Sequence, residues 1–219
     1  MGSEIDLLQH YPKSPRKVME RGADKTEEDR AVARKFAEEF FDGDRRHGYG
    51  GFTYSPRFWQ PVIPTLQEHF GLTSESSLLD VGCAKGFFMH DLAELIPGIS
   101  VSGVDVSQYA IEHAIEDMRG NVQVADAQAL PFDDDSFDVV ISDNSIHNLE
   151  LDQCAQALRE IERVSRGGSF ITVDAYRSEA ERDRMMAWNL TAKTILSAED
   201  WVQLFADVGY TGDYYWFIP

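Results

Sequence analysis

The residues best placed to do chemistry lie where a short apolar run meets a glycine-containing loop. The run at 78–81 carries one acid, Asp80, and is followed by Gly82 and Gly86 in the spacing G-x-x-x-G. Small residues let a backbone approach a ligand closely, and the helix that follows offers unsatisfied N–H groups at its N-terminus. This pattern predicts a ligand site at a strand–loop–helix turn.

Asp80 and Asp105 restrict the chemistry of that ligand. A carboxylate beside the loop repels a pyrophosphate in a low-dielectric pocket and attracts an ammonium group. Asp105 lies 19 residues after Gly86, close to the roughly 20 expected of an acid that binds a ribose, but the loop lacks the G-x-G-x-x-G spacing of dinucleotide sites. We therefore expect a ligand with an ammonium, a ribose and an adenine. A nucleotide-dependent oxidoreductase is the disfavoured alternative.

From residue 77 onward, short apolar runs alternate with runs of helical periodicity. Strands are expected at 77–81, 100–106, 121–127, 137–143 and 169–175, and helices at 86–96, 107–118 and 152–165. Buried strands that alternate with amphipathic helices are typical of a parallel sheet covered by helices. The sequence predicts an α/β fold: a Rossmann-like, mostly parallel sheet with helices on both faces, plus an N-terminal helical lid.

The chain is expected to divide at about residue 75. Residues 1–75 are predicted to form a polar arm, a helix from Thr26 to about Phe41 and a glycine-rich lid loop, and residues 76–219 the core. An inserted helix is expected at about 178–196 and another at 198–208. One aromatic strand, 211–219, then either closes the sheet edge or leaves it to a partner chain. An open aromatic edge is an association site, which suggests a homodimer.

These motifs resemble those of the class I S-adenosylmethionine (SAM)-dependent methyltransferases. LLDVGCAKG is similar to their first motif, with Ala84 where glycine is usual, and VSGVDVS is similar to the segment that carries the acid of the second strand. VQVADAQALPFDDDSFDVVIS is similar to their third strand, adenine loop and fourth strand. The resemblance covers residues 76–174 and is strongest to the ubiquinone-biosynthesis-like small-molecule methyltransferases. It implies SAM as the cofactor and S-adenosylhomocysteine as the product.

The resemblance also implies a role for each residue around the ligand. Asp80 would hold the methionine ammonium, directly or through water. Asp105 would accept hydrogen bonds from both ribose hydroxyls, and Val106 would pack on the adenine. Asp126 would accept from the adenine amino group, while the Ala127 N–H would bind a ring nitrogen. The methionine and ribose would be lined by Gly82, Cys83, Ala84, Gly86 and the backbone of Asn144.

Several of these roles have local alternatives. Asp80 could instead cap the following helix, and Asp126 could form a turn. Cys83 has no evident partner base and is expected to be a buried packing residue rather than a nucleophile. Lys85, inside the loop, is expected to be solvated.

A sulfonium methyl group is already activated, so its transfer needs in-line positioning more than acid–base help. A base matters only where the acceptor is protonated, and His147 is the best candidate because an imidazole titrates near neutral pH. The alternative is that His147 packs beside the methionine and only hydrogen-bonds. Asp143 and Asp174 could chelate Mg²⁺, but Ala175 stands where catechol-type methyltransferases have asparagine, so no metal is expected.

Two segments are expected to close the site. In similar enzymes a lid tyrosine reaches the SAM carboxylate. The candidates here are Tyr54 and Tyr49, both in the loop 47–59. Tyr54 is also a candidate for catalysis. The alternative is an aromatic patch packed on the edge of the fold. A substrate roof, or else an ordinary apolar helix face, is expected from Met185, Met186, Trp188 and Asn189.

Composition limits the class of partner. The 219 residues carry a net charge of −18, which opposes binding to nucleic acid or anionic lipid because those surfaces are themselves negative. Basic residues cluster near the N-terminus at Arg16, Lys17, Arg21, Arg45 and Arg46, and these are expected to balance nearby acids. Two cysteines make no disulfide framework, and no apolar run is long enough to span a membrane, so a cytoplasmic protein is expected.

These observations together predict a SAM-dependent methyltransferase that acts on an O or N atom of a small molecule. The main alternative is a non-catalytic SAM-binding partner subunit, since its binding residues would look the same.

Overall fold

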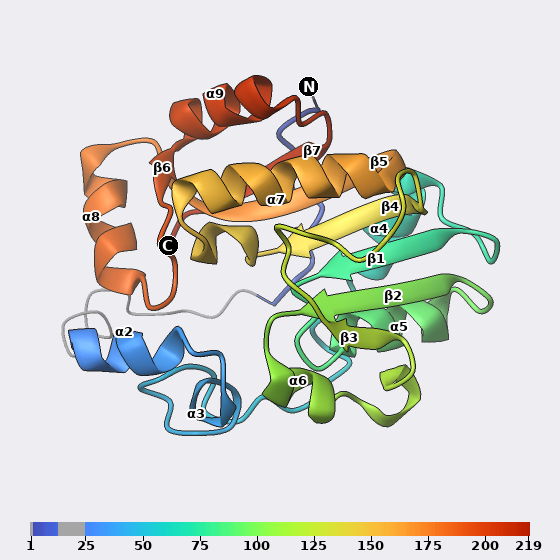
Figure 1. Ribbon diagram of the computed structural model, residues 1–219, viewed down its shortest axis with the longest axis horizontal. Coiled ribbons are helices and arrows are strands. Elements are labelled where there is room, and N and C mark those ends of the chain that lie inside the picture. Colours follow the sequence, from blue (N-terminus) through green and yellow to red (C-terminus); the bar gives the residue numbers. More distant parts are fainter. Residues whose placement is uncertain (1, 13–24) are drawn as a thin grey trace.

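The structure is a computed structural model that describes residues 2–12 and 25–219. Within them seven strands form one sheet in the order β3-β2-β1-β4-β5, with β6 and β7 both paired to β5 (Figure 1). Every strand pair is parallel. The strands are β1 (Ser77–Val81), β2 (Ser100–Asp105), β3 (Val122–Val124), β4 (Phe137–Asp143), β5 (Ser165–Tyr176), β6 (Leu196–Ser197) and β7 (Asp213–Phe217). The predicted Rossmann-like α/β fold is confirmed.

Helices cover both faces of the sheet (Figure 1). α7 (Leu151–Val164) and α9 (Ala198–Val208) pack on one face, whereas α4 (Ile63–Phe70) and α5 (Phe87–Leu95) pack on the other. Successive side chains of a strand point to opposite faces. In β5, Ile171 and Val173 therefore enter the α7/α9 core and Phe170 enters the α4/α5 core.

The strand order reverses between β1 and β4, which places a topological switch point at the middle of the sheet. From β1 the chain moves outward through β2 to β3, and then returns to β4 on the other side of β1. Asp105, Asp143 and Asp174 lie at or near the carboxyl ends of their strands, so the parallel pairing brings them to one edge. Ligands of open α/β sheets bind outside this edge.

The outer edge of β7 is covered in part by the N-terminal segment of the same chain. The Ile5 N–H donates to the Tyr214 carbonyl at 3.0 Å, and the Tyr214 N–H donates to the Ser3 carbonyl at 3.1 Å. Leu7 is buried in the α4/α5 core. Residues 3–7 are thus part of the fold rather than a polar arm, and a single strand closes the sheet. The homodimer stays a prediction, without support from an open edge.

Residues 25–54, which we name the cap, lie below the carboxyl edge of the sheet in Figure 1. A capping box between Thr26 and Asp29 starts α2 (Glu27–Ala33) as the sequence predicts. The predicted helix does not continue to Phe41, because Phe36 has a φ of +48°, a left-handed conformation that breaks the helical path. The chain resumes as α3 (Glu38–Phe41).

Two predicted helices are shorter than their periodicity suggests. The helix expected at 107–118 is α6 (Gln108–Glu112) followed by a 3₁₀ turn, η1 (Glu116–Met118). The insertion after β5 forms α8 (Glu179–Trp188) and then a loop. Asn189 ends α8 because its side chain bonds both the N–H and the carbonyl of Ala192, each at 2.8 Å, an alternative to helical bonding. No described helix combines the length and the apolar character needed to cross a membrane.

Candidate functional site

A cavity of about 1510 Å³ opens at the carboxyl ends of β1, β2, β4 and β5. Pockets for one drug-sized ligand usually enclose about 300–1,000 Å³, so this cavity has room for a cofactor and an acceptor together. Seven of the predicted binding residues line it, namely Gly82, Ala84, Asp105, Val106, Asp126, Ala127 and Asn144, and so does His147, the predicted base.

The glycine loop turns tightly over the end of β2. Gly82 has a φ of +90°, and a Cβ atom there would lie 2.2 Å from the Ser145 Oγ, so only glycine fits. The N–H groups of Gly82 and Cys83 both donate to the Val104 carbonyl. Ala84, where the family pattern has glycine, has a φ of +48°, in the left-handed region that glycine adopts with least strain.

Asp80 is buried behind this loop rather than at the cavity surface. Its side chain does not line the cavity, whereas the next residues, Val81 and Gly82, do. Burial raises the pKa of Asp80 well above its usual value, and the charges of Asp143 and Asp105 raise it further. Among the described residues no hydrogen-bond donor reaches its carboxylate. Asp80 therefore fits a water-mediated rather than a direct contact with an ammonium in the cavity.

Cys83 and Gly86 do not line the cavity, contrary to the sequence prediction. The Cys83 side chain is 5% exposed, belongs to the α4/α5 core and would touch a Cβ atom at Gly103. Burial raises the pKa of its thiol well above the usual value, so it is a packing residue and not a nucleophile. Gly86 is the N-cap of α5 and positions the helix rather than the ligand.

Asp105 is oriented by two backbone groups. Its Oδ2 accepts from the Ala84 N–H and its Oδ1 from the Ser107 N–H, both at 2.8 Å. Each carboxylate oxygen keeps a second lone pair, so the side chain is fixed and can still accept from two hydroxyls. Burial raises the pKa of Asp105. The next residue, Val106, is 60% exposed at the cavity, as expected of an apolar side chain that packs on an adenine.

Asp126 forms the turn that was the local alternative and also lies at the cavity. Its Oδ1 accepts from the Gln128 N–H at 2.9 Å, which forms a turn, and the Gln128 amide also donates to both carboxylate oxygens. Asp126 and Ala127 nevertheless line the cavity. Across the cavity, Asn144 has a φ of +49°, and its N–H is shared between the carbonyl and the hydroxyl of Thr172.

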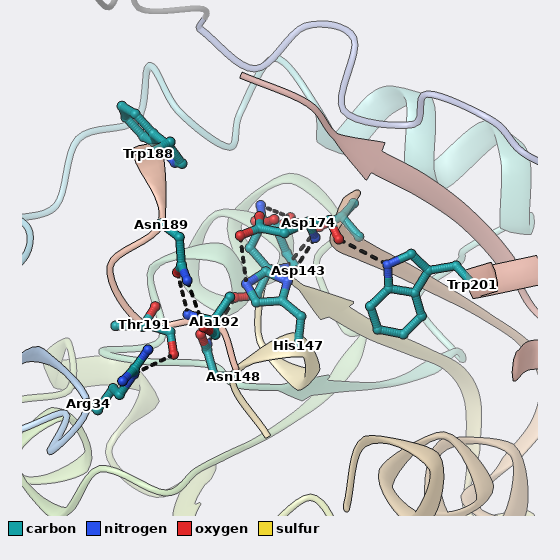
Figure 2. Close-up of polar contacts among 12 residues, drawn as sticks. Arg34, Asp143, His147, Asn148, Asp174, Trp188, Asn189, Thr191, Ala192 and Trp201 are labelled. Atoms are coloured by element: carbon teal, nitrogen blue, oxygen red, sulfur yellow. Dashed lines mark hydrogen bonds and ion pairs between the residues drawn. The ribbon is translucent and has the colours of Figure 1, made fainter. Parts of the chain in front are cut away.

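His147 lies in η2 (Ile146–Asn148), directly after β4, and is 4% exposed. Its Nδ1 accepts a hydrogen bond from the backbone N–H of Asp174 at 3.0 Å, so this nitrogen carries no proton. The proton of the neutral ring is therefore on Nε2, which lies 3.9 Å from the Asp174 Oδ2 (Figure 2). A nitrogen that already holds a proton cannot take another, and Nδ1 is occupied. This arrangement opposes the general-base role predicted for His147 and favours the alternative of a hydrogen-bonding ring.

The two strand-end acids differ in their partners. The Asp143 Oδ1 accepts from the Thr172 hydroxyl and from the Asn144 amide, the latter at 3.0 Å. Burial raises the pKa of both Asp143 and Asp174. Neither acid belongs to a cluster of three metal-type side chains. In the described parts of the chain, such a cluster forms on α5, from His90, Asp91 and Glu94.

Tyr54 lies outside the cavity, which corrects its assignment to cofactor binding and catalysis. Its hydroxyl donates to the Asp91 Oδ1 at 2.7 Å, and its ring packs against Phe87 and His90. Burial, followed by the Asp91 hydrogen bond, raises the pKa of Tyr54 to about 12. The side chain thus attaches the cap to α5, as the alternative of a packed aromatic patch implies. Tyr49, the other candidate, does line the cavity.

Lys85 is not solvated as predicted. It is 7% exposed, and its Nζ lies 2.6 Å from the Asp42 Oδ2 and 3.1 Å from the Phe52 carbonyl. The Tyr109 hydroxyl donates to the same Asp42 oxygen at 2.7 Å. The loop that starts α5 is thereby joined to the cap. Sequence analysis missed this pair because 43 residues separate its members, although a lysine within a tight loop was a signal.

The predicted roof is formed by half of its candidates. Trp188 and Asn189 line the cavity, whereas Met185 is buried and Met186 is exposed outside it. The cap reaches the roof through basic side chains. The Arg34 Nε donates to the Thr191 carbonyl at 3.3 Å (Figure 2), and the Lys25 Nζ donates to the Trp188 carbonyl at 2.8 Å. Cap and roof therefore meet across the cavity.

The cluster of basic residues noted in the sequence is only partly described. Arg46 pairs with Asp29 at 3.0 Å, and the Arg45 guanidinium donates to the carbonyls of Gly48 and Tyr49. Arg46 thus balances a nearby acid as predicted. Arg16, Lys17 and Arg21 lie outside the described residues.

Comparisons with known proteins identify the family. A family model of the methyltransferase domain matches residues 72–209, more than half of the chain. The demethylmenaquinone methyltransferase of Roseiflexus castenholzii is 32% identical over 114 residues, which cover 50% of this chain and 47% of that protein. The tRNA (carboxymethyluridine(34)-5-O)-methyltransferase of Arabidopsis thaliana is 31% identical over 153 residues, which cover 68% of this chain and 35% of that protein. The chain spans 35–60% of the length of the first curated relatives that it matches.

Solved structures share the fold. The crystal structure of the MccD protein superimposes with a TM-score of 0.54 at 27% identity, covering 66% of this chain and 68% of that one. The [4+2]-cyclase SpnF superimposes with a TM-score of 0.56 at 26% identity, covering 68% of this chain and 56% of that one. With the fold, the motifs and the family match in agreement, the chain belongs to the class I SAM-dependent methyltransferase family.

Proposed function

We propose that this protein transfers a methyl group from SAM to an oxygen or nitrogen atom of a small molecule. The observation that carries the proposal is Asp80, a buried carboxylate behind the glycine loop that no described protein donor satisfies. A buried carboxylate without a partner is costly, and an ammonium group in the adjoining cavity would offset that cost. SAM carries such an ammonium on its methionine part.

The chain's own residues then bind and orient the cofactor, which supplies an activated methyl group when bound. Asp105 is held by two backbone N–H groups so that its remaining lone pairs can accept from the ribose hydroxyls. Val106 and Ala127 provide surface for the adenine, and Asp126 provides acceptors at the same place. Asn144, just past the end of β4, would contribute backbone near the methionine part.

Charge favours a small acceptor over a nucleic acid. The chain carries a net charge of −18, and Asp143, Asp174 and Asp105 line the cavity itself. A polyanion would meet repulsion both on approach and inside the site. One relative is named as a tRNA methyltransferase, but its match covers 35% of that protein. A small-molecule acceptor and a cytoplasmic location are therefore part of this proposal.

Calorimetry with S-adenosylhomocysteine and with NAD tests the ligand class. We expect micromolar affinity for S-adenosylhomocysteine and no comparable affinity for NAD, because a carboxylate behind the loop opposes a pyrophosphate. Tighter binding of NAD would contradict the assignment. Turnover of SAM in the presence of candidate acceptors then separates an enzyme from a SAM-binding partner subunit. EDTA is expected to leave turnover intact, and a loss that Mg²⁺ restores would instead indicate a metal at Asp143 and Asp174.

A further inference from the structure

An unusual donor and acceptor pair faces the cavity at the carboxyl ends of β4 and β5. Asp174 is 6% exposed and lines the cavity. No described residue donates a hydrogen bond to its carboxylate, although its backbone N–H and carbonyl are bound by His147 and Trp201. The backbone of Asp174 is thus fixed on both sides while its side chain is left to the cavity (Figure 2).

The His147 ring presents the matching donor. Because Nδ1 accepts from the Asp174 N–H, the ring proton is on Nε2, and Nε2 lies 3.9 Å from the Asp174 Oδ2. That distance is too long for a direct hydrogen bond. If one oxygen atom lies at an ordinary hydrogen-bond distance of about 2.7–2.9 Å from both groups, the angle at that oxygen between the His147 Nε2 and the Asp174 Oδ2 is roughly a right angle. This is about 20° below the roughly tetrahedral angle between the donor and acceptor directions of a hydroxyl group, a deviation that hydrogen bonds tolerate.

We propose that the methyl acceptor is a hydroxyl group, that the His147 Nε2–H orients its oxygen and that the Asp174 carboxylate takes its proton. This inference rests on the proposed methyl transfer and names its acceptor class. A lone pair of the hydroxyl oxygen forms the new O–CH₃ bond, and the electron pair of the broken C–S bond returns to sulfur, which leaves S-adenosylhomocysteine. The hydroxyl proton passes to the Asp174 carboxylate and from there to solvent.

The count of lone pairs favours oxygen over nitrogen. A hydroxyl oxygen has two lone pairs, so one can accept from His147 while the other attacks the methyl group. A neutral amine has a single lone pair, which it would need for both purposes, and an ammonium has none. Asp143 is a poorer proton acceptor than Asp174 because the Thr172 hydroxyl and the Asn144 amide already donate to its Oδ1.

The first test uses tritium transfer from labelled SAM to matched pools of alcohols, phenols and the corresponding amines. We expect label in a hydroxyl pool and not in its amine counterpart. With the best acceptor, Asp174→Asn should lower kcat by at least about 100-fold, the typical contribution of a positioned base, while S-adenosylhomocysteine affinity is retained. Asp138→Asn is the control, since Asp138 is also an acid of the central sheet but lies near the start of β4, outside the cavity, where it pairs with Arg166, and its kcat should be unchanged.

His147 variants separate an orienting donor from a base. Glutamine retains an N–H near the position of Nε2 but cannot take a proton, so His147→Gln should keep kcat within about 10-fold while His147→Ala loses more. Equal and severe losses in both variants, with near-normal turnover in Asp174→Asn, would overturn the inference. Transfer to amines alone would also overturn it. Failure of the wild-type chain to bind S-adenosylhomocysteine would instead overturn the proposed function.

If no pool is labelled, a measurement that needs no acceptor still tests the arrangement of His147 and Asp174. The protein contains six histidines, and long-range ¹H–¹⁵N NMR of histidine-labelled protein, assigned with His147→Gln, reports which ring nitrogen holds the proton. We expect the neutral His147 ring to carry its proton on Nε2, because Nδ1 accepts from the Asp174 N–H. A neutral ring with its proton on Nδ1 would refute the arrangement.

Discussion

Acidic side chains in the cap and at the carboxyl edge of the sheet differ in their hydrogen-bond donors and in the direction in which their pKa values are shifted. In the cap, Asp29 accepts from the backbone and hydroxyl of Thr26 and from Arg46. These hydrogen bonds lower the pKa of Asp29 well below its usual value. Partial burial alone would raise the pKa of Asp42, but hydrogen bonds from Lys85, Tyr109 and the Phe52 N–H outweigh it and lower that pKa to about 2.

At the edge of the sheet the acids are buried with few protein donors. Burial raises the pKa of Asp80, Asp105, Asp143 and Asp174. Asp80 and Asp174 receive no side-chain hydrogen bond from any described residue. Asp29 and Asp42 thus find their donors within the protein, whereas the side chains of Asp80 and Asp174 at the edge of the sheet do not. A ligand can therefore supply donors to Asp80 and Asp174, and the ligand-free protein is less stable because it leaves these buried groups without them.

Removal of Asp80 should have the largest effect on binding and the opposite effect on stability. Asp80→Asn should weaken S-adenosylhomocysteine by about 10- to 100-fold, because a hydrogen bond to a charged group contributes about 1.5–3 kcal/mol. The ligand-free variant should melt at a higher temperature, since a buried unpaired carboxylate is gone. Calorimetry and ligand-free melting curves measure both. A ligand-free variant that melts at a lower temperature would mean that Asp80 has a structural partner, which would contradict the contrast between Asp80 and the acids of the cap.

Removal of Lys85 should lower the stability of the protein, whereas removal of Asp80 should raise it. Lys85→Met leaves Asp42 without its cation and should cost about 1–3 kcal/mol, which is roughly 2–10 °C in melting temperature for a chain of this length. Lys193→Met is the control, because the pair of Lys193 with Glu150 is longer, at 3.4 Å, and exposed, and should contribute less than about 1 kcal/mol. Equal small losses in both variants would show that the Lys85–Asp42 pair does not hold the cap.

The two regions should also respond to pH with opposite signs. The lowered pKa of Asp42 adds stability that is present above its usual value of 3.8 and is lost as pH falls from there to about 2. The raised pKa of Asp80 does the reverse: its contribution to stability is lost as pH rises above the usual value of 3.8 through the raised pKa, so ligand-free stability should increase as pH falls toward 3.8. Melting curves across pH should be flatter above pH 4 in Asp80→Asn, and flatter below pH 4 in Asp42→Asn. An Asp80→Asn curve that is as steep as that of the wild type above pH 4 would contradict the sign assigned to Asp80.

Much of the sheet could be predicted from local sequence. The apolar runs around 77–81, 100–106 and 137–143 have a length and spacing that are typical of buried parallel strands, and the structure has strands there. The glycine loop was equally predictable from Gly82 and Gly86 directly after an apolar run, and in the structure Gly82 has no room for a Cβ atom. Helix ends were less predictable. Phe36 breaks a periodic run through a backbone conformation that no residue type announces.

At the site, too, some features follow from local sequence and others depend on contacts between distant segments. By itself, the sequence determined which acids end which strands, because strand periodicity places Asp105 and Asp143 at the carboxyl edge. It could not determine where Tyr54 and Lys85 point, since Asp91 and Asp42, their partners, lie 37 and 43 residues away. Nor could it assign the His147 proton, which depends on a backbone N–H that β5 brings to the ring from 27 residues away. Strand ends follow from local pattern, but hydrogen bonds between distant segments exist only once the fold has brought donor and acceptor together.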